Sequence, residues 1–188
     1  KDDPNVAPQF LDDIITETDR LSRLVGQLLD LSRIETGVIT PRREPVALDT
    51  LAQTLVNEHA SRAAEQNIEL QIDAPNDLPC VNADPDQMRQ VWLNLIVNAI
   101  KFTPANGRIT VAARRVTLTR ASNHLPAGDW VTGSIADTGA GIDAADLPHI
   151  FERFYRVDKA RTRGADDAQS EGVGLGLAIV KSIIDAHR

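Results

Sequence analysis

Residues 92–102 read WLNLIVNAIKF, an apolar helical stretch interrupted by two asparagines four positions apart. Positions i and i+4 share one face of a helix, so Asn94 and Asn98 are expected to lie side by side. Asparagine is a poor helix former, and a buried amide costs free energy unless it finds partners. Two glycine-rich stretches follow, DTGAGI at 137–142 and EGVGLGL at 171–177. Together these patterns predict a pocket for Mg²⁺ and a nucleotide.

The composition of the 188-residue chain fits one domain plus an appendage. The formal net charge is −7 and no basic stripe is present, which argues against electrostatic binding to nucleic acid. The single cysteine, Cys80, excludes an internal disulfide and a cysteine-rich zinc site, and it is expected to be a small buried hydrophobe. No apolar run approaches the ~18 residues that span a bilayer. Because the chain starts at Lys1, upstream context is expected to be missing.

Residues 1–40 are predicted to form a separate unit built on one long amphipathic helix at 9–36. Its apolar positions recur at steps of three and four, and they make a stripe too wide for a lone surface helix. Such a width is typical of a helix bundle. Because the sequence contains no partner helix, we expect this stripe to be buried by another molecule or to remain exposed.

Residues 41–188 are predicted to form a second unit, an α/β sandwich of the α+β class. The expected elements are a strand in REPVAL (43–48), a helix from a cap at Asp49 to about Gln66, a strand at 68–73, the asparagine helix between Asp84–Pro85 and Thr103–Pro104, two long strands in 107–119 and 129–139, and a last helix at 173–186. Residues 156–171 show no apolar period and are expected to form a mobile loop.

The end of the asparagine helix carries the residue types that a magnesium–nucleotide site needs. An amide oxygen such as that of Asn98 is a hard ligand, and Mg²⁺ prefers few protein ligands together with waters and phosphates. Lys101 lies one turn later, where it could reach phosphate oxygens, and Phe102 could pack on a base. The alternative, in which both asparagines bond to neighbouring loop backbone, stays open at this point.

Each glycine-rich stretch allows a functional and a structural interpretation. Asp137 ends an alternating strand and could accept from an exocyclic amine, while Gly139 and Gly141 let the backbone approach a ring; the alternative is an ordinary turn. The glycines of the second stretch open the last helix, where free N–H groups bind anions; the alternative is a hinge. These glycines are Gly172, Gly174 and Gly176. Their spacing does not fit a dinucleotide-binding fingerprint, and no P-loop is present.

FERFYR (151–156) is expected to anchor the loop that follows it. Phe151 and Phe154 lie three positions apart and form an apolar patch. Its arginines are more often solvated than catalytic. The four histidines are scattered without a metal-like or triad-like neighbour, so no chemistry is assigned to them.

Taken together, these motifs resemble the catalytic half of a bacterial sensor histidine kinase. LNLIVNAIKFTP resembles the N box of that family, DTGAGI its G1 box, FERFYR its F box and GVGLGLAIVKSI its G2 box. The helix ending in LLDLSRIETG resembles the second helix of the dimerisation and phosphotransfer hairpin. The likeness covers nearly the whole chain. It implies a Bergerat-type ATP-binding sandwich, in which a mixed sheet carries helices on one face.

The resemblance also implies a role for each matching residue. Asn98 would hold Mg²⁺, with Asn94 beside the triphosphate, Lys101 on phosphate and Asp137 reading the adenine amine. Phe102, Gly139, Gly141 and Ile142 would shape the base pocket, whereas Gly172, Gly174, Leu175 and Gly176 would lie at the phosphates. Residues 143–173 would form a lid, from which Arg156 would reach the γ-phosphate.

The implied activity is transfer of the ATP γ-phosphate to a histidine and then to an aspartate of a response regulator. The acceptor histidine of the family lies in an H box on the first helix of the hairpin, and this sequence contains no such motif. The acceptor histidine is therefore expected upstream of this chain. The resemblance also implies a parent protein in the bacterial cell membrane, with this chain as part of its cytoplasmic domain. Any membrane anchor is likewise expected upstream. The hairpin would also make a homodimer. The family usually continues beyond the last helix with closing strands, so an open sheet edge is expected.

Two other classes of function compete with this interpretation. Topoisomerase and mismatch-repair ATPases share the sandwich, but they carry a water-activating glutamate where this chain has Asn94. A side-chain amide cannot act as a general base, which favours transfer over hydrolysis. A non-catalytic nucleotide-sensing or dimerisation module is the third possibility, and the presence of Asn98, Asp137 and the G2 glycines argues against it.

Overall fold

The computed structural model describes residues 6–36, 40–75, 77–121, 125–157 and 173–187. Its elements are α1 (Val6–Glu35), β1 (Glu44–Val46), α2 (Leu48–Glu65), β2 (Glu69–Asp73), β3 (Val81–Ala83), α3 (Pro85–Phe102), β4 (Arg108–Leu118), β5 (Gly128–Asp137) and α4 (Gly176–Ala186). Among the described residues, every helix is too short or too polar to cross a membrane.

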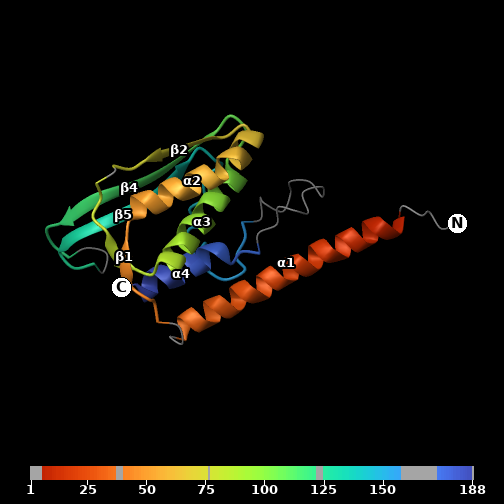
Figure 1. The fold of residues 1–188 in the computed structure, drawn as a ribbon, viewed down its shortest axis with the longest axis horizontal. Coiled ribbons are helices and arrows are strands. Elements are labelled where there is room, and N and C mark those ends of the chain that lie inside the picture. Colours follow the sequence, from red (N-terminus) through yellow and green to blue (C-terminus); the bar gives the residue numbers. More distant parts are fainter. Residues whose placement is uncertain (1–5, 37–39, 76, 122–124, 158–172, 188) are drawn as a thin grey trace.

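The larger sheet has the order β2-β4-β5 and is mixed. β2 runs parallel to β4, and β4 runs antiparallel to β5 with Ile109 opposite Asp137. β1 and β3 form a separate antiparallel pair beside it. α2 and α3 lie across one face of the larger sheet, while α4 packs against α3 (Figure 1). The predicted α+β sandwich, with a mixed sheet and helices on one face, is therefore confirmed.

The core between the sheet and the helices follows the alternation of β4. Ile109 and Val111 point inward and are fully buried against α2 and α3. Trp92 of α3 is only 4% exposed and lies directly on β5. A Cβ placed on Gly133 would come within 2.7 Å of the Trp92 indole, so glycine is required there for the ring to reach the strand. This contact fixes the distance between α3 and the sheet.

The ends of α3 are set by its own sequence, as predicted. The carboxylate of Asp84 accepts from the backbone N–H groups of Asp86 and Gln87, each at 3.1 Å, and Pro85 opens the first turn. At the other end, the N–H of Thr103 donates to Ala99 at 3.0 Å before Thr103 turns to an extended conformation. Because both ends of α3 are fixed, the positions of the two asparagines along the helix are fixed as well.

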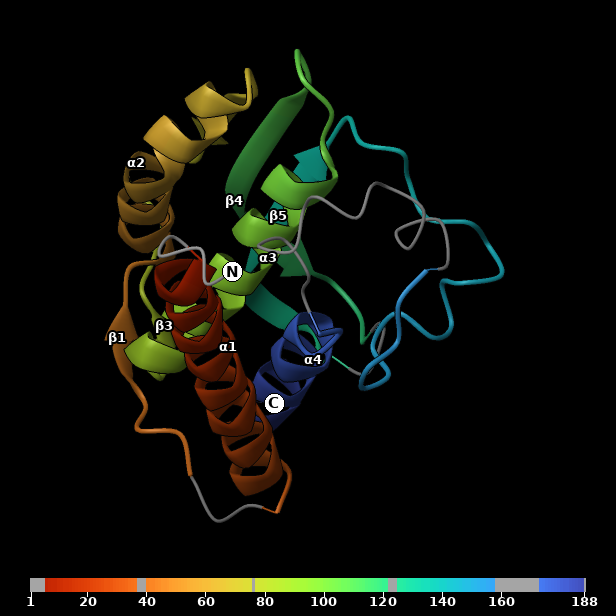
Figure 2. The same cartoon turned by 90° about the vertical axis from the view of Figure 1, so that its right-hand side faces the viewer.

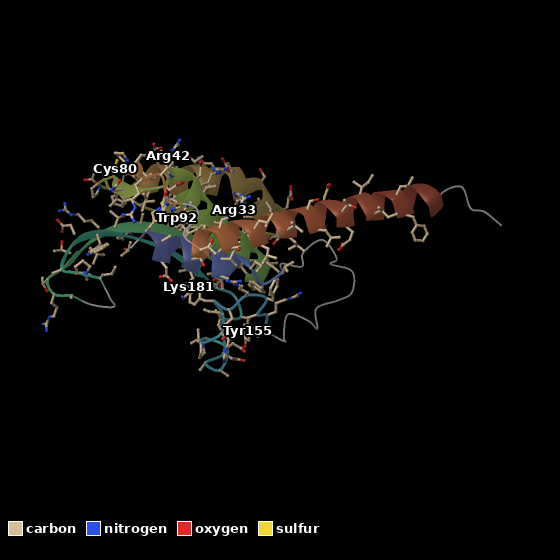
Figure 3. All side chains as sticks on the ribbon, turned by 90° about the horizontal axis from the view of Figure 1, so that it is seen from below. Arg33, Arg42, Cys80, Trp92, Tyr155 and Lys181 are labelled. Carbon is tan, nitrogen blue, oxygen red and sulfur yellow. The ribbon has the colours of Figure 1, made fainter. Side chains whose placement is uncertain are left out.

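The last turns of α1 dock on the sandwich, while its N-terminal part stands away from it (Figures 1 and 3). Leu31 and Ile34 are buried in a core that they share with Ile179 and Ile183 of α4. Figure 2 shows α1 and α4 side by side, with α3 behind them. The C-terminal end of the stripe that was expected to lack a partner is thus buried within this chain, whereas these described side chains of α1 are exposed: Phe10, Leu11, Ile14, Ile15, Leu21, Val25, Leu28 and Leu29.

Two local predictions are wrong. α2 begins at Leu48 with Ala47 before it, so Asp49 lies inside the first turn; its carboxylate accepts from the N–H of Thr50 at 2.8 Å instead of capping the helix. Cys80 is exposed rather than buried, because it precedes the short strand β3 at the edge of the molecule (Figure 3).

Surface ion pairs on the larger sheet perturb two carboxyl groups. A hydrogen bond from Arg108 to Glu69, at 2.7 Å, holds the pKa of Glu69 below its ordinary value. The hydroxyl of Thr117 donates to Asp129 at 2.6 Å and Arg115 donates at 2.8 Å; these contacts lower the pKa of Asp129, the hydroxyl contributing most. Both carboxyl groups lie on the surface: Glu69 neighbours the start of β4, where Arg108 also bonds to Thr138, whereas Asp129 lies near the opposite end of the β4–β5 ladder.

Candidate nucleotide-binding site

Asn94 and Asn98 both face the first residue of α4. A Cβ placed on Gly176 would lie 3.6 Å from Oδ1 of Asn94 and 3.8 Å from Nδ2 of Asn98. The two asparagines are half-buried, one turn apart on α3, as their spacing predicted. The structure thus brings the N box and the second glycine-rich stretch together, although they are about eighty positions apart in the chain.

The amide of Asn94 offers a donor that lacks an acceptor. Its Nδ2 is buried and has no hydrogen-bond partner within the described part of the chain. Leaving such a donor unsatisfied costs about 1–3 kcal/mol. It lies beside the N-terminus of α4, whose first turn contains no acidic residue and whose free N–H groups favour anions. An amide donor next to a helix N-terminus is suited to a phosphate oxygen.

The loop before α4 is shaped by Gly174. This residue has φ +78°, a conformation that favours glycine, and a Cβ there would lie 2.8 Å from the carbonyl oxygen of Tyr155. The N–H of Phe154 donates to the Gly174 carbonyl at 3.0 Å. The F-box segment therefore packs directly on the glycine loop, and half-buried Arg156 follows one residue beyond this contact.

Asp137 stands in a tight turn against the end of α3. Its Oδ1 accepts from the N–H of Gly139 at 2.8 Å. A Cβ on Gly139 would come within 2.7 Å of the Phe102 carbonyl oxygen, so only glycine permits this approach. Gly141 also has a positive φ, +71°, but open space surrounds it. The Asp137 carboxylate is exposed and remains accessible to a ligand.

Lys101 and Phe102 end α3 on the same side as this turn. Nζ of Lys101 lies 5.4 Å from the centroid of the Phe102 ring, within the range of a cation–π interaction. Phe102 is 45% exposed although it is large and apolar. Ile142, in the turn after Asp137, is exposed as well. Together these residues provide apolar surface on which a flat ring could stack.

The phenylalanines of FERFYR do not serve as a core anchor, contrary to the prediction. Phe151 is 44% exposed and Phe154 is 56% exposed, and Phe154 has φ +63°. The segment is held instead by polar contacts: the hydroxyl of Tyr155 donates to Asp146 at 2.7 Å, and His149 pairs with Glu152 at 2.7 Å. The predicted mobile loop at 156–171 falls almost wholly on residues 158–172, outside the described residues, as does Gly172.

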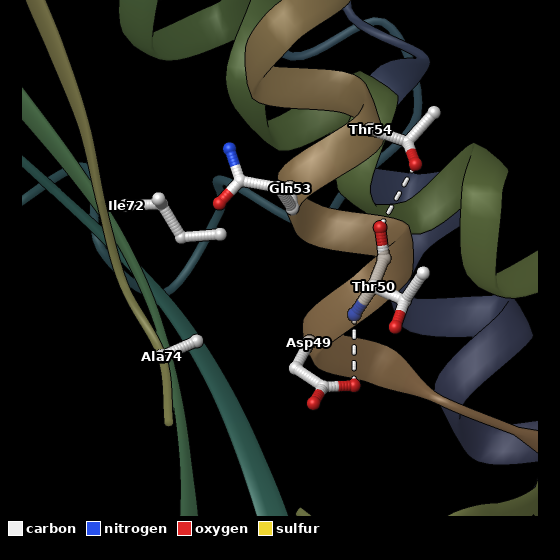
Figure 4. A pocket seen from close by; sticks show the side chains of 6 residues that line it. All are labelled: Asp49, Thr50, Gln53, Thr54, Ile72 and Ala74. Carbon is white, nitrogen blue, oxygen red and sulfur yellow. Dashed lines mark hydrogen bonds between the residues drawn. The ribbon is translucent and has the colours of Figure 1, made fainter. Parts of the chain in front are cut away.

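A separate cavity of about 290 Å³ lies between α2 and the helix-facing side of β2 and the residue after it (Figure 4). It is lined by Asp49, Thr50, Gln53, Thr54, Ile72 and Ala74. None of the asparagine or glycine residues described above borders it. We therefore place the candidate site at the α3–α4 junction and not in this cavity.

The sequence did not reveal the residues that join the elements carrying the site to the rest of the fold. Thr138 bonds to the backbone of Arg108, Trp92 packs on Gly133, and His187 accepts from the N–H of Asp84 at 3.0 Å. A threonine after an aspartate and a histidine near a helix end are common, so neither carried a local signal. The residues they bind are distant in sequence, and only the fold brings them together.

Comparison with known proteins identifies the family to which this chain belongs. Residues 83–188 match the family described as histidine kinase-, DNA gyrase B-, and HSP90-like ATPase, and residues 1–37 match the His kinase A (phospho-acceptor) domain. The chain is 36% identical over 185 residues to the sensor protein kinase WalK of Staphylococcus haemolyticus, covering 98% of this chain and 28% of WalK. It is 40% identical over 182 residues to drug sensory protein A of Synechocystis sp., covering 96% of this chain and 26% of that protein.

A solved structure with the same arrangement is full-length ShkA, crystallised in complex with AMPPNP. It superposes with a TM-score of 0.76 at 30% identity, over 95% of this chain and 34% of ShkA. The chain thus spans about a quarter to a third of the length of these relatives. The chain matches the ATPase family over more than half of the chain's own length and the phospho-acceptor family over its first helix. It therefore belongs to the histidine kinase-, DNA gyrase B- and HSP90-like ATPases, in the sensor histidine kinase branch.

Proposed function

We propose that this region binds Mg-ATP and supports transfer of the γ-phosphate to a histidine on a helix upstream, from which the phosphate passes to an aspartate of a response regulator. The observation that carries the proposal is the pair Asn94 and Asn98 facing the N-terminus of α4 at Gly176. One face of this junction supplies amides and the other supplies free backbone donors, which is what a triphosphate with its metal ion requires.

The residues at the junction fit a magnesium ion. No cluster of three or more carboxylate, histidine or cysteine ligands occurs among the described residues, so an all-protein metal cage is not available there. Mg²⁺ commonly takes one or two protein oxygens and completes its octahedron with phosphates and waters. We assign the amide oxygen of Asn98 as that protein ligand. When bound, the metal would neutralise phosphate charge; the protein supplies its orientation.

The triphosphate is assigned to donors from both helices. The orphan Nδ2 of Asn94 would satisfy its hydrogen-bonding requirement on a phosphate oxygen. The glycine-rich loop would present backbone N–H groups, and Lys101 would add a positive charge from the end of α3. The loop residues assigned to phosphate binding are Gly172, Gly174, Leu175 and Gly176. Arg156 would approach the γ-phosphate from the F-box segment that packs on Gly174.

The base is assigned to the turn after β5. Oδ1 of Asp137 accepts from the N–H of Gly139, and the exposed carboxylate would accept from an exocyclic amine of the base. Phe102 and Ile142 provide exposed apolar surface for the ring, and Gly141 leaves space beside it. Residues 143–173 would then close over the nucleotide as a lid.

Phosphoryl transfer is favoured over hydrolysis because of what stands at Asn94. An ATPase of this fold needs a carboxylate there to activate water, and an amide cannot take a proton at neutral pH. The competing function, a Bergerat-fold ATPase, therefore lacks its base. A nucleotide-sensing module without catalysis predicts binding without transfer, and the experiment below separates it from a kinase.

The domain assignment and the partners follow from the exposed part of α1. We assign residues 1–40 to the second helix of a dimerisation hairpin and residues 41–188 to the catalytic domain. Among the side chains of α1 that the structure describes, eight large apolar ones are exposed, which supports a homodimer through a helix bundle in the parent protein. Placement of that parent in the bacterial cell membrane, with this region on the cytoplasmic side, is part of the same proposal.

Two measurements test the proposed function in sequence. Isothermal calorimetry with ATP in the presence of Mg²⁺, and again with EDTA, is expected to show metal-dependent binding. Labelled ATP is then mixed with the chain and a separate hairpin fragment that carries an acceptor histidine; transfer to that fragment is expected. Binding without transfer would favour a sensing module, release of inorganic phosphate alone would favour an ATPase, and no binding would overturn all three.

A further inference from the structure

The hydroxyl of Thr138 takes the place of a backbone carbonyl at the end of the β4–β5 ladder. Ile109 and Asp137 are the last pair in register. In the next pair, the N–H of Thr138 donates to the Arg108 carbonyl at 3.1 Å, whereas the N–H of Arg108 donates to Oγ1 of Thr138 at 2.9 Å. A hydrogen-bonded antiparallel pair normally exchanges two backbone bonds. Here a side chain satisfies the second donor, so the Thr138 carbonyl is released from the ladder.

This substitution of acceptors allows the chain to turn directly after Asp137. The Thr138 carbonyl and the Gly139 N–H belong to one planar peptide unit, so neither can rotate without the other. In the structure the Gly139 N–H points at Oδ1 of Asp137, at 2.8 Å. If the carbonyl instead turned toward Arg108 to continue the ladder, that N–H would turn away and the carboxylate would lose its hold. The hydroxyl therefore determines which way Asp137 points.

The same hydroxyl lies against the end of α3. A Cβ on Gly107 would be 2.9 Å from Oγ1 of Thr138 and 2.4 Å from Cγ2 of Thr103, so these side chains occupy the space that glycine leaves. Thr103 is buried, and its own hydroxyl donates to the Ala99 carbonyl at 2.7 Å. The junction thus fixes the turn after β5 relative to the helix that carries Asn98.

We propose that Thr138 is a positioning residue for nucleotide recognition: its hydroxyl, by accepting from the Arg108 N–H, ends the strand and orients the Asp137 carboxylate toward the base. The inference rests on the proposed function, in which Asp137 accepts from the adenine amine. Thr138 itself need not touch the nucleotide. Its effect should therefore be specific to ligands that carry the amine.

The experiment compares two ligands across matched variants. ATP carries the exocyclic amine, and purine riboside triphosphate lacks only that group. T138V keeps the branched shape but removes the acceptor, whereas T138S keeps the acceptor. The control is T132V: Thr132 also joins the two strands, since its hydroxyl donates to the Arg114 carbonyl at 3.3 Å, but it lies farther along the ladder from Asp137.

We expect T138V to bind ATP roughly three- to tenfold more weakly, the range that corresponds to one lost hydrogen bond, and to bind purine riboside triphosphate as the wild type does. T138S and T132V should retain the wild-type preference for ATP. Amide hydrogen exchange in T138V should be faster at Arg108 or Gly139, while the thermal midpoint reports global stability.

The outcomes separate this inference from the proposed function. If the wild type fails to bind ATP, the proposed function is wrong and the role of Thr138 falls with it. If the wild type binds ATP and T138V keeps the same preference, only the role of Thr138 is overturned. An equal loss for both ligands in T138V, tracking a lower thermal midpoint, would also overturn it, because it would mark a purely structural residue.

Discussion

The backbone N–H of Asp84 donates to Nε2 of His187 at 3.0 Å, which joins the cap of α3 to the residue that ends α4. Nδ1 of the same ring lies 2.8 Å from the Ile183 carbonyl, so one nitrogen accepts while the other donates. The Asp84 carboxylate also accepts from the Arg42 N–H at 2.8 Å. One aspartate and one histidine therefore connect the start of α3, the end of α4 and the segment that enters β1.

His187→Ala is expected to lower the free energy of unfolding by about 1–2 kcal/mol, because the Asp84 N–H loses a half-buried acceptor. Denaturant titration followed by circular dichroism measures it. His59→Ala is the matched control, since His59 makes the same contact within its helix, Nδ1 to the Leu55 carbonyl at 3.0 Å, and forms no hydrogen bond to another segment among the residues that the structure describes. Equal effects in the two variants would contradict the bridging role.

Asn98→Ala is expected to remove most of the magnesium-dependent part of ATP affinity, because Asn98 is the protein ligand assigned to Mg²⁺ in the proposed site. Losing one contact to a charged partner costs roughly 1.5–3 kcal/mol. Calorimetry in Mg²⁺ and in EDTA measures the difference. Asn57→Ala on the exposed face of α2 serves as the control. Unchanged affinity of the Asn98 variant in Mg²⁺ would remove Asn98 from the site.

Asp137→Asn is expected to weaken ATP more than it destabilises the fold. Asparagine keeps the shape and can still accept from Gly139, but it replaces the charged acceptor for the adenine amine with a neutral one. A thermal melt run beside an ATP titration separates the two effects. A large fall in melting temperature with intact affinity would show that Asp137 is only a turn residue.

Gly176→Ala is expected to weaken ATP binding while it keeps or raises the stability of the fold. The added methyl would meet Asn94 at an ordinary contact distance of 3.6 Å, and alanine favours a helix over glycine by up to about 1 kcal/mol. The fold should therefore keep or raise its melting temperature. The methyl fills the space between α3 and α4, so ATP should bind roughly tenfold more weakly, or by about 1.4 kcal/mol. Full affinity would place the phosphates elsewhere.

Thr117→Val is expected to raise the pKa of Asp129 toward the ordinary aspartate value, because the hydroxyl that chiefly stabilises the carboxylate is removed. In the wild type the lowered pKa of Asp129 stabilises the fold at pH values above the ordinary aspartate pKa. This contribution to the free energy of unfolding is lost as the pH falls through the lowered pKa. A carboxyl-carbon NMR titration measures both proteins. No difference between them would mean that Arg115 alone sets the shift.

The sequence predicted the parts of this fold that are encoded by neighbouring residues. Asp84 with Pro85, and Thr103 with Pro104, gave both ends of α3, because a cap and a following proline act within one turn. The four-residue spacing of Asn94 and Asn98 gave their common face. The alternation of β4 and β5 gave two paired strands, since one face of the sheet is buried.

The features that the sequence did not predict depend on contacts between residues that are far apart in the chain. The cap at Asp49 was wrong because Leu48 is buried in the core cluster that also holds Leu31, Ile34 and Val46, so α2 begins two residues before the position that a cap at Asp49 would give. Exposed Phe151 and Phe154 were expected to be core because their three-residue spacing indicates an apolar patch but does not show whether another part of the fold covers it. The contacts of Thr138 and His187 join segments 30 and 103 positions apart, beyond any local pattern.

The contact between Trp92 and Gly133 gives this chain an optical probe. The chain has two tryptophans; Trp92 is buried on α3, two positions before Asn94, while Trp130 lies nearer the surface of β5. Replacing Trp130 with phenylalanine would leave a single indole whose emission depends on the spacing between helix and sheet. Ligand-induced displacement of α3 could then be followed in stopped flow by tryptophan fluorescence, without attaching a dye and without altering any residue assigned to the nucleotide.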